Sequence, residues 1–263
     1  MSSHWTVLGV QRCIERMTGG FGRDEGLHFG DPRREVRKAL ICWMADEEAI
    51  AAAAAFGADV IVTHESLFYP YDIVVNGGVP DFMAWRTNAR RIERLAAAGL
   101  SVIRAHGSVD KLCIFDDFAE ALGLGDPVVE ESDYVSVYEV REMTYGTMIE
   151  RVKAALKLDR LRVTDGDRSR PVSRIGLPWG GMGLFVNVGY MERLIRHGCD
   201  LFIAGETDNY GFRFALGAGI DMIETSHEIS ENPGLRRFAQ LLADELEGIE
   251  VRFHENRIAY TIV

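Results

Sequence analysis

Four short stretches of this chain are apolar, rich in β-branched residues, and end abruptly on a histidine or an acidic residue. They cover residues 58–64, 100–106, 200–206 and 220–227. Short apolar runs of this kind are typical of buried strands in a parallel sheet. Their last residues are His64, His106, Glu206 and His227. In an open α/β sheet, ligands bind in the crevice outside the carboxyl ends of the strands, so we expect these four side chains to face one site.

Acidic residues follow the three histidines at short spacing. Glu65 comes directly after the first histidine, Asp110 four residues after the second, and Glu231 four residues after the third. If a helix or tight turn begins after His106 or His227, the residue four positions further on points to the same side and each pair forms a two-atom clamp. Three histidines and three or four carboxylates, without a nearby cysteine, suit a pair of borderline-to-hard divalent metals.

Each of these residues also has an ordinary structural explanation. A single histidine at a strand end commonly bonds a neighbouring carbonyl group. Glu231 by itself could simply favour a helix dipole, with Asn232 as the N-cap and Pro233 in the first turn. The clustering favours the metal interpretation, because imidazole and carboxylate groups crowded at one edge need a compensating cation. The other histidines lack this context and are expected at the surface or in packing positions: His4, His28, His197 and His254.

The length and composition of the chain limit its class. A chain of 263 residues with 47% hydrophobic content can bury a large core, and we expect two lobes, residues 1–125 and 126–263, with a boundary near the Gly123–Pro127 segment. The formal net charge of −11 argues against a nucleic-acid-binding surface. The four scattered cysteines are expected to be buried thiols of a reducing cytosol. We recognise no targeting or membrane-spanning segment, which predicts a cytoplasmic protein.

Helical and strand-like segments alternate along the chain, which predicts parallel strands with right-handed crossovers. Helices are expected over residues 8–17, 47–56, 81–98, 147–156, 190–197, 210–216 and 234–246. Further strands are expected over residues 36–43, 134–140, 161–164, 173–177, 250–253 and 258–263. Asp46 is expected to cap the helix that follows it, and Gly57 to end that helix.

Two further motifs have competing interpretations. The glycine-rich segment 180–183 follows a predicted strand and precedes a helix, so it could bind an anion through backbone N–H groups or form a plain tight turn, which is the commoner case. Ser66 and Ser108 lie near His64 and His106 in the sequence, but no G-x-S-x-G motif accompanies them. We therefore do not favour a nucleophilic serine.

Six segments, taken in order, resemble the motifs of one known family. Residues 26–31, 62–69, 105–110, 180–183, 203–206 and 225–231 are similar to its G-L-x-x-G-D, T-H-H-P-L-x-F, A-H-T-N-L-D, glycine-turn, T-G-E and G-H-x-x-x-E motifs. The family is that of the GTP cyclohydrolase I type 2-like, or NGG-interacting-factor-three-like, dinuclear metal proteins. The resemblance covers essentially the whole chain.

The resemblance implies an α/β fold with two α/β/α lobes of mostly parallel sheets. It also implies a dinuclear metal site at the carboxyl ends of the strands, between the lobes, and commonly a ring-shaped homohexamer. The positions that match the family's metal ligands are His64, Glu65, Asp110, His227 and Glu231, with His106 as a further ligand or a proton donor. Two divalent ions, Zn, Fe or Mn, are the implied cofactors.

The chain departs from the family pattern in its second motif. Glu65 stands where the family has the second histidine of T-H-H-P, and Ser66 replaces the proline. A carboxylate ligand at this position shifts the preference toward harder cations such as Mn²⁺, Fe²⁺ or Mg²⁺. Alternatively, Glu65 turns away and one of the two metals is held weakly.

Two classes of function fit these residues. The first is a metal-dependent hydrolase of a small polar or nucleotide-like molecule, in which His106 or Glu206 transfers the proton. The second is a non-catalytic metal-binding or metallochaperone-like protein. Turnover of a small molecule by the metal-loaded protein distinguishes the two.

Overall fold

The computed structural model describes residues 4–70, 82–131 and 135–262. The chain divides into two compact units, which we name unit 1 (Met1–Ile114 and Gly234–Asn256) and unit 2 (Phe115–Pro233 and Arg257–Val263). This division differs from the expected lobes 1–125 and 126–263 mainly because Gly234–Asn256 returns to the first unit.

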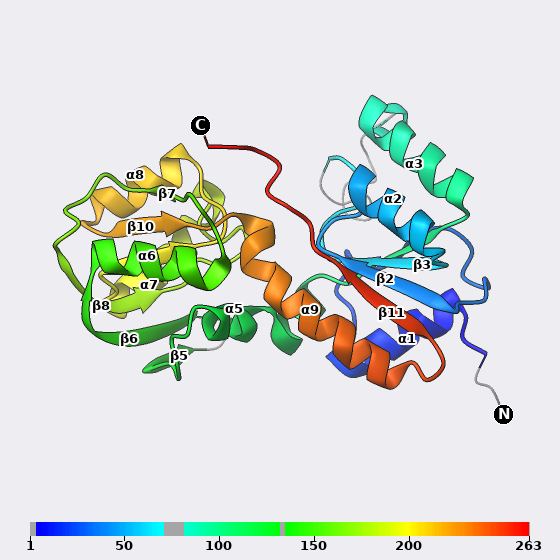
Figure 1. Cartoon of the computed structure of the whole chain (residues 1–263), viewed down its shortest axis with the longest axis horizontal. Coiled ribbons are helices and arrows are strands. Elements are labelled where there is room, and N and C mark those ends of the chain that lie inside the picture. The colour runs from blue at the N-terminus through cyan, green and yellow to red at the C-terminus, as the bar shows by residue number, and fades with distance from the viewer. Residues whose placement is uncertain (1–3, 71–81, 132–134, 263) are drawn as a thin grey trace. The chain divides into compact units, whose positions relative to one another are not determined.

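Unit 1 contains a five-stranded sheet in the order β1-β4-β3-β2-β11. Its strands are β1 (Gly26–Phe29), β2 (Lys38–Cys42), β3 (Val60–Thr63), β4 (Ser101–Arg104) and β11 (Glu250–His254). All neighbours pair in parallel except β1, which is antiparallel to β4 at one edge. The helical segments are α1 (Val7–Thr18), α2 (Glu47–Phe56), η1 (Phe82–Ala84), α3 (Arg86–Ala98), α4 (Gly107–Val109) and η2 (Asp110–Ile114). Figure 1 shows α2 and α3 over one face of this sheet and α1 over the other.

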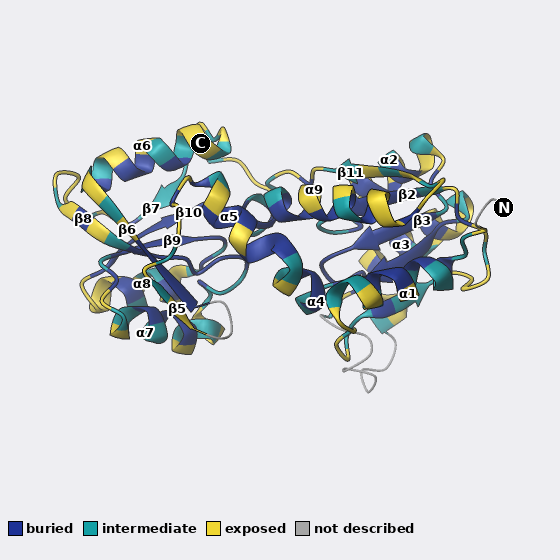
Figure 2. Ribbon diagram, turned by 90° about the horizontal axis from the view of Figure 1, so that it is seen from below, coloured by how far each residue is buried: buried dark blue, intermediate teal, exposed yellow. Residues whose placement is uncertain are grey.

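The apolar runs of the sequence form the core of unit 1. Ile61 and Val102 from the central strands pack with Ile50 of α2 and Leu95 of α3, and all four are buried. Strands β2, β3 and β4 are covered on both faces, which is why the middle residues of each strand are apolar (Figure 2). Each such side chain contributes about 1.5–3 kcal/mol when it is fully buried.

Helix α2 follows the local sequence closely. The Asp46 carboxylate accepts a hydrogen bond from the Ala49 amide at 2.8 Å, which satisfies an N–H group of the first turn. Gly57 ends the helix in the left-handed region, with a φ of 73°. Both predictions are confirmed. The helix expected from Asp81 corresponds to η1 and α3, and Asp81 itself lies outside the described residues.

Unit 2 contains a six-stranded sheet in the order β5-β6-β8-β9-β10-β7. Its strands are β5 (Val129–Glu131), β6 (Val135–Thr144), β7 (Arg162–Val163), β8 (Pro171–Gly176), β9 (Leu201–Ala204) and β10 (Asp221–Glu224). The helical segments are α5 (Phe115–Ala121), α6 (Tyr145–Leu156), η3 (Phe185–Asn187), α7 (Val188–Arg196) and α8 (Asn209–Gly217). In Figure 2, α6 lies over one face of the sheet, and α7 and α8 lie over the other.

The predicted α/β fold is confirmed, and its two sheets differ in strand direction. Unit 1 is mostly parallel, whereas in unit 2 only the pairs β8/β9 and β9/β10 are parallel. Strand β5 ends at Glu131 and β6 begins at Val135, and so short a connection permits only an antiparallel pair. The strand expected from Tyr134 is therefore β6, with Tyr134 itself outside the described residues.

Helix α9 (His227–Glu245) begins earlier than the sequence predicts. The expected start, with Asn232 as the N-cap, is wrong, because Pro233 lies inside the helix. Strand β10 ends only three residues before α9, and Ser226 adopts a left-handed φ of 88° just ahead of the first helical residue. An internal proline costs about 3 kcal/mol, which burial of side chains such as Phe238 and Leu242 on α9 offsets.

Within the described part of the chain, no helix combines the length with the apolar character that a membrane crossing requires. The four cysteines are buried free thiols, as the sequence predicts. Burial raises the pKa of the Cys199 thiol to about 12, so this side chain is a poor thiolate nucleophile at neutral pH.

A buried asparagine holds the loop that follows β2. The Asn256 side-chain oxygen accepts hydrogen bonds from the backbone amides of Trp43 and Met44, and its side-chain nitrogen donates to the Met44 carbonyl oxygen. The Trp43 carbonyl oxygen in turn accepts hydrogen bonds from the amides of His64 and Glu65, at 3.1 and 2.7 Å. Asn256 therefore supports the backbone that carries two of the predicted ligands.

We expect Asn256→Ala to lower the free energy of unfolding by about 2 kcal/mol, because three backbone groups of this loop lose their partner. Chemical denaturation followed by circular dichroism measures the change. Gln240→Ala, at an exposed position of α9, is the control and should change the stability by less than about 0.5 kcal/mol. Equal losses in the two variants would contradict the role given to Asn256.

Candidate metal centre

In unit 1, the residues that follow β3 and β4 leave the sheet side by side. The two strands are parallel, with Thr63 opposite Arg104. The side chains of His64, Glu65 and His106 consequently gather at one edge, and a ligand atom of each lies within 4.8 Å of the others. The structure thus brings three of the predicted site residues together.

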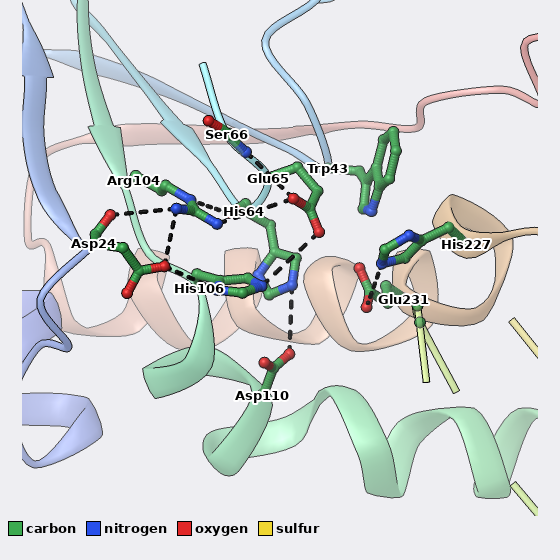
Figure 3. A network of polar contacts seen from close by, with 12 residues as sticks. Asp24, Trp43, His64, Glu65, Ser66, Arg104, His106, Asp110, His227 and Glu231 are labelled. Carbon is green, nitrogen blue, oxygen red and sulfur yellow. Dashed lines mark hydrogen bonds and ion pairs between the residues drawn. The ribbon is translucent and has the colours of Figure 1, made fainter. Parts of the chain in front are cut away.

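His64 is almost completely buried, and both of its ring nitrogens face oxygen atoms. Its Nδ1 lies 3.1 Å from the Ala105 carbonyl oxygen, and its Nε2 lies 3.3 Å from a carboxylate oxygen of Asp110 (Figure 3). A carbonyl oxygen can only accept, so Nδ1 carries the hydrogen. The Nε2 lone pair of a neutral ring then points toward an anionic oxygen, an arrangement that a cation between the two atoms would stabilise.

His106 is held in a similar way by a residue that the sequence analysis missed. Its Nδ1 lies 3.2 Å from the Asp24 carboxylate, and its Nε2 lies 3.8 Å from Glu65. Burial disfavours the charged ring. The hydrogen bond to Asp24 and the nearby carboxylates of Glu65 and Asp110 nevertheless raise the pKa of His106 to about 9. The same hydrogen bond lowers the pKa of Asp24 to about 2.

Two neighbouring side chains complete the support of this strand end. Glu25 accepts hydrogen bonds from the backbone amides of His106 and Ser108, at 2.6 and 3.2 Å, and from the Ser108 hydroxyl at 2.5 Å. Arg104 is fully buried, and its guanidinium lies 2.9 Å from Asp24 and 3.9 Å from Glu65. It supplies positive charge where the carboxylates are densest. The only sequence signal for Asp24 and Glu25 is their position just before the 26–31 motif.

In unit 2, the predicted residues gather at the ends of β9 and β10. These strands are parallel, and the Ser226 amide beyond β10 donates to the Gly205 carbonyl oxygen beyond β9 at 2.8 Å. His227 has its Nδ1 3.1 Å from Glu206 and its Nε2 3.2 Å from Glu231, one helical turn away in α9. The predicted spacing of four residues therefore does place His227 and Glu231 on one side of a helix. The hydrogen bond from His227 lowers the pKa of Glu206 below its usual value.

The glycine-rich segment 180–183 packs against this pair. A Cβ atom at Gly180 would lie 2.3 Å from the Glu231 carboxylate and 3.2 Å from His227 Nε2, and Gly180 has a φ of 49°. Its amide donates to the Ser230 hydroxyl, and its carbonyl oxygen accepts from the Glu206 amide. The Gly180 N–H group is thus used inside the protein, which supports the tight-turn interpretation over an anion cradle.

The three histidines share one arrangement that fits a divalent metal. One ring nitrogen of each histidine faces an acceptor outside the candidate ligands, namely the Ala105 carbonyl oxygen, Asp24 or Glu206. The other ring nitrogen faces the carboxylate of a candidate ligand. This is the usual setting of metal-binding histidines. Ligand bonds of about 2.1 Å place an imidazole nitrogen and a carboxylate oxygen roughly 3.0–3.5 Å apart at common coordination angles. The pairs His64–Asp110 and His227–Glu231, at 3.3 and 3.2 Å, lie in this range, and His106–Glu65 at 3.8 Å is slightly wider.

Other predicted residues have different roles in the structure. The Ser66 hydroxyl donates to the Phe68 carbonyl oxygen, and that of Ser108 to Glu25, so neither is arranged as a nucleophile. His197 pairs with Glu131 at 2.7 Å on the surface of unit 2, as expected of a histidine outside the site. Asp110, which was expected to form a clamp with His106, instead makes a direct 3.3 Å contact with His64.

Comparison with known proteins identifies the family. The sequence model of Duf34/NIF3 (NGG1p interacting factor 3) matches residues 22–258. The chain belongs to this family. A relative in Lactococcus lactis, named GTP cyclohydrolase 1 type 2 homolog, is 25% identical over 245 residues, which is 90% of this chain and 88% of the relative. A protein of the same name in Archaeoglobus fulgidus is 27% identical over 227 residues, 83% of this chain and 84% of the relative.

Solved structures agree on the fold of this Duf34/NIF3 member. The crystal structure of a Bacillus cereus protein related to NIF3 aligns over 100% of both chains, with a TM-score of 0.78 and 16% identity. HcgD from Methanocaldococcus jannaschii aligns over 96% of this chain and 99% of its own, with a TM-score of 0.72 and 18% identity. The family model confirms the family resemblance predicted from six motifs, and these structures confirm the fold.

We expect Gly180→Ala to reduce metal binding, because its Cβ atom would displace the Glu231 carboxylate. Gly57→Ala is the matched control, since Gly57 also has a positive φ, of 73°, but nothing lies within 4 Å of its Cβ position. Both variants should lose about 1 kcal/mol of stability from backbone strain. Elemental analysis after reloading should show a metal deficit in Gly180→Ala alone, and equal metal content in the two variants would contradict this account.

The raised pKa of His106 should make the stability of the metal-free protein depend on pH. The stabilisation by its protonated ring is fully present below about pH 6.5 and is lost as the pH rises through about 9. Asp24→Asn should therefore lower the melting temperature of chelator-treated protein more at pH 6 than at pH 10. An equal difference in melting temperature from wild type at both pH values would contradict a stabilising proton on His106.

Proposed function

We propose that this chain is a divalent-metal-binding protein that holds two metal ions and hydrolyses a small polar substrate. The observation that carries the proposal is the shared arrangement of the three histidines, each with one ring nitrogen toward an outer acceptor and the other toward a carboxylate. The candidate ligands are His64, Glu65, His106, Asp110, His227 and Glu231.

Residues behind these ligands position them. Asp24 and Glu206 orient His106 and His227 through their Nδ1 atoms, and the Ala105 carbonyl oxygen orients His64. Such outer partners typically change metal affinity by about 10–100-fold when they are removed. Arg104 offsets part of the negative charge of the carboxylates in unit 1, which moderates the affinity of that ligand set for cations.

The proposed chemistry is metal-assisted hydrolysis. A bound divalent metal would polarise a substrate C=N, C–O or P–O centre and make water more acidic. His106, about one-quarter exposed and paired with Asp24, is the candidate for moving a proton if it is not itself a metal ligand. Glu206, whose pKa is lowered, is better suited to orienting His227 than to donating a proton. Because the relatives are named GTP cyclohydrolase 1 type 2 homolog, GTP is the first substrate to test.

A second candidate is a non-catalytic metal-binding protein. Glu65 favours it, because one of its carboxylate oxygens accepts from the Ser66 amide and faces Arg104. A ligand shared with a fixed cation binds metal less strongly than the imidazole found at this position in the family motif. A screen of metal-loaded protein against GTP, other nucleotides, cyclic amides and phosphoesters decides between the two, with Glu231→Ala as the control. Turnover that disappears in the control supports the hydrolase.

The metal content of single variants should separate ligands from other residues. We expect wild-type protein reloaded with Mn²⁺, Fe²⁺ or Zn²⁺ to hold about two metals per chain. Asp110→Ala and Glu231→Ala should each hold fewer, and the surface variant His197→Ala should equal wild type. Elemental analysis measures all four proteins. Saturation of wild type below one metal per chain, or equal content in all variants, would refute the proposal.

The double variant Asp110→Ala/Glu231→Ala tests whether the two ligand sets act on the same metals. If they bind separate ions, the losses of the single variants add. If each single variant already loses both metals, the double variant loses no more, and the two sets depend on each other.

A further inference from the structure

A cavity of about 620 Å³ lies in unit 2, and none of the candidate metal ligands lines it. It is formed by the segment around β7, the end of β10 and residues 258–262 near the C-terminus. Its apolar wall includes Leu158, Leu161 and Ile258, and its polar wall includes Arg162 and Glu224. Ligand pockets commonly enclose about 300–1,000 Å³, so the space suits a small organic molecule.

Glu224 is the decisive residue of this cavity, because its carboxylate is buried and incompletely satisfied. Only 2% of its side chain is exposed. The Arg162 guanidinium, at 3.0 Å, and the Thr207 amide, at 3.5 Å, both donate to the same oxygen, Oε1. Within the described residues, Oε2 receives no hydrogen bond, although Arg162 lies 2.9 Å from it. Burial, which Arg162 offsets only in part, raises the pKa of Glu224 to about 7.

The cations of the cavity are already engaged. Arg162 contacts Glu224 and lies over the ring of Phe212, 5.2 Å from its centre. Arg160 donates to the Ile262 carbonyl oxygen. An anionic ligand would have to compete with Glu224 for Arg162, whereas a ligand with N–H donors would add hydrogen bonds to the carboxylate.

We propose that this cavity binds a small molecule that presents an amidine-like N–H group to Oε2 of Glu224 and an apolar body to Leu158, Leu161 and Ile258. An amidine carries a positive charge together with its N–H donors, so it suits a carboxylate oxygen that receives no hydrogen bond from the described residues. The proposed site does not depend on the metal-binding function, because none of the proposed ligands lines the cavity.

Benzamidine is the probe for this site, and benzoate, of the same shape and opposite charge, is its control. Calorimetric titration of the full-length wild-type chain should show saturable binding of benzamidine and none of benzoate. Glu224→Gln keeps the shape of the side chain and removes its charge, and it should weaken benzamidine at least tenfold. Ile258→Trp keeps the carboxylate and fills the cavity, so it should also weaken benzamidine binding at least tenfold. If Glu224→Gln fails to fold, Ile258→Trp tests the proposal in its place.

Glu231→Gln separates this site from the metal ligands. It should bind benzamidine as wild type does while losing metal, and Glu224→Gln should keep its metal content. The proposal is overturned if benzamidine does not bind at 10 mM (roughly 2.7 kcal/mol at the 1 M standard state) or if benzoate binds more tightly than benzamidine. It is also overturned if neither cavity variant weakens benzamidine binding, or if Glu231→Gln weakens that binding as much as the cavity variants do. None of these outcomes bears on the metal content of the wild-type protein, which tests the proposed function separately.

Discussion

Parallel strand pairing in register is the constraint on which the rest of this structure depends. Because β3 and β4 end at the same level, the two residues after each strand emerge beside one another at one edge of the unit 1 sheet. The same is true of β9 and β10 in unit 2, where Ala204 pairs with Glu224. A shift of one residue in either pair would turn every side chain of the strand to the other face and separate the polar groups.

Gathering carboxylates at buried strand ends is unfavourable unless positive charge accompanies them. In unit 1, the fully buried Arg104 supplies that charge beside Asp24 and Glu65, and the raised pKa of His106 favours a charged ring there as well. In unit 2, His227 lies between two carboxylates, Glu206 and Glu231. Metal binding to His106 would replace a proton on its ring, so the affinity for metal and the stability of the apo protein are linked through this group.

The family motifs and the clustering of histidines and acidic residues at strand ends point to the same candidate ligands. They differ in what they say about Glu65. The motif marks it as a substitution of histidine, whereas the structure adds that its side chain is buried beside His106 and Arg104. Glu65 therefore lies in one group with His64 and His106, where a ligand atom of each is within 4.8 Å of the others. Whether a metal uses this carboxylate depends on how strongly Arg104 competes for it.

Local features were readable from the sequence because neighbouring residues decide them. The Asp46 cap and the Gly57 end of α2, the apolar strands with histidine or acid at their ends, and the spacing of His227 and Glu231 all depend on contacts within a few residues. The tertiary structure alone decided which distant segments meet. It placed Asp24 and Glu25 behind His106, paired Asp110 with His64, and added β11 to the sheet of unit 1. It also began α9 at His227 despite the Asn-Pro signal that follows. These arrangements arise from strand register and packing between residues far apart in the chain, which no local pattern encodes.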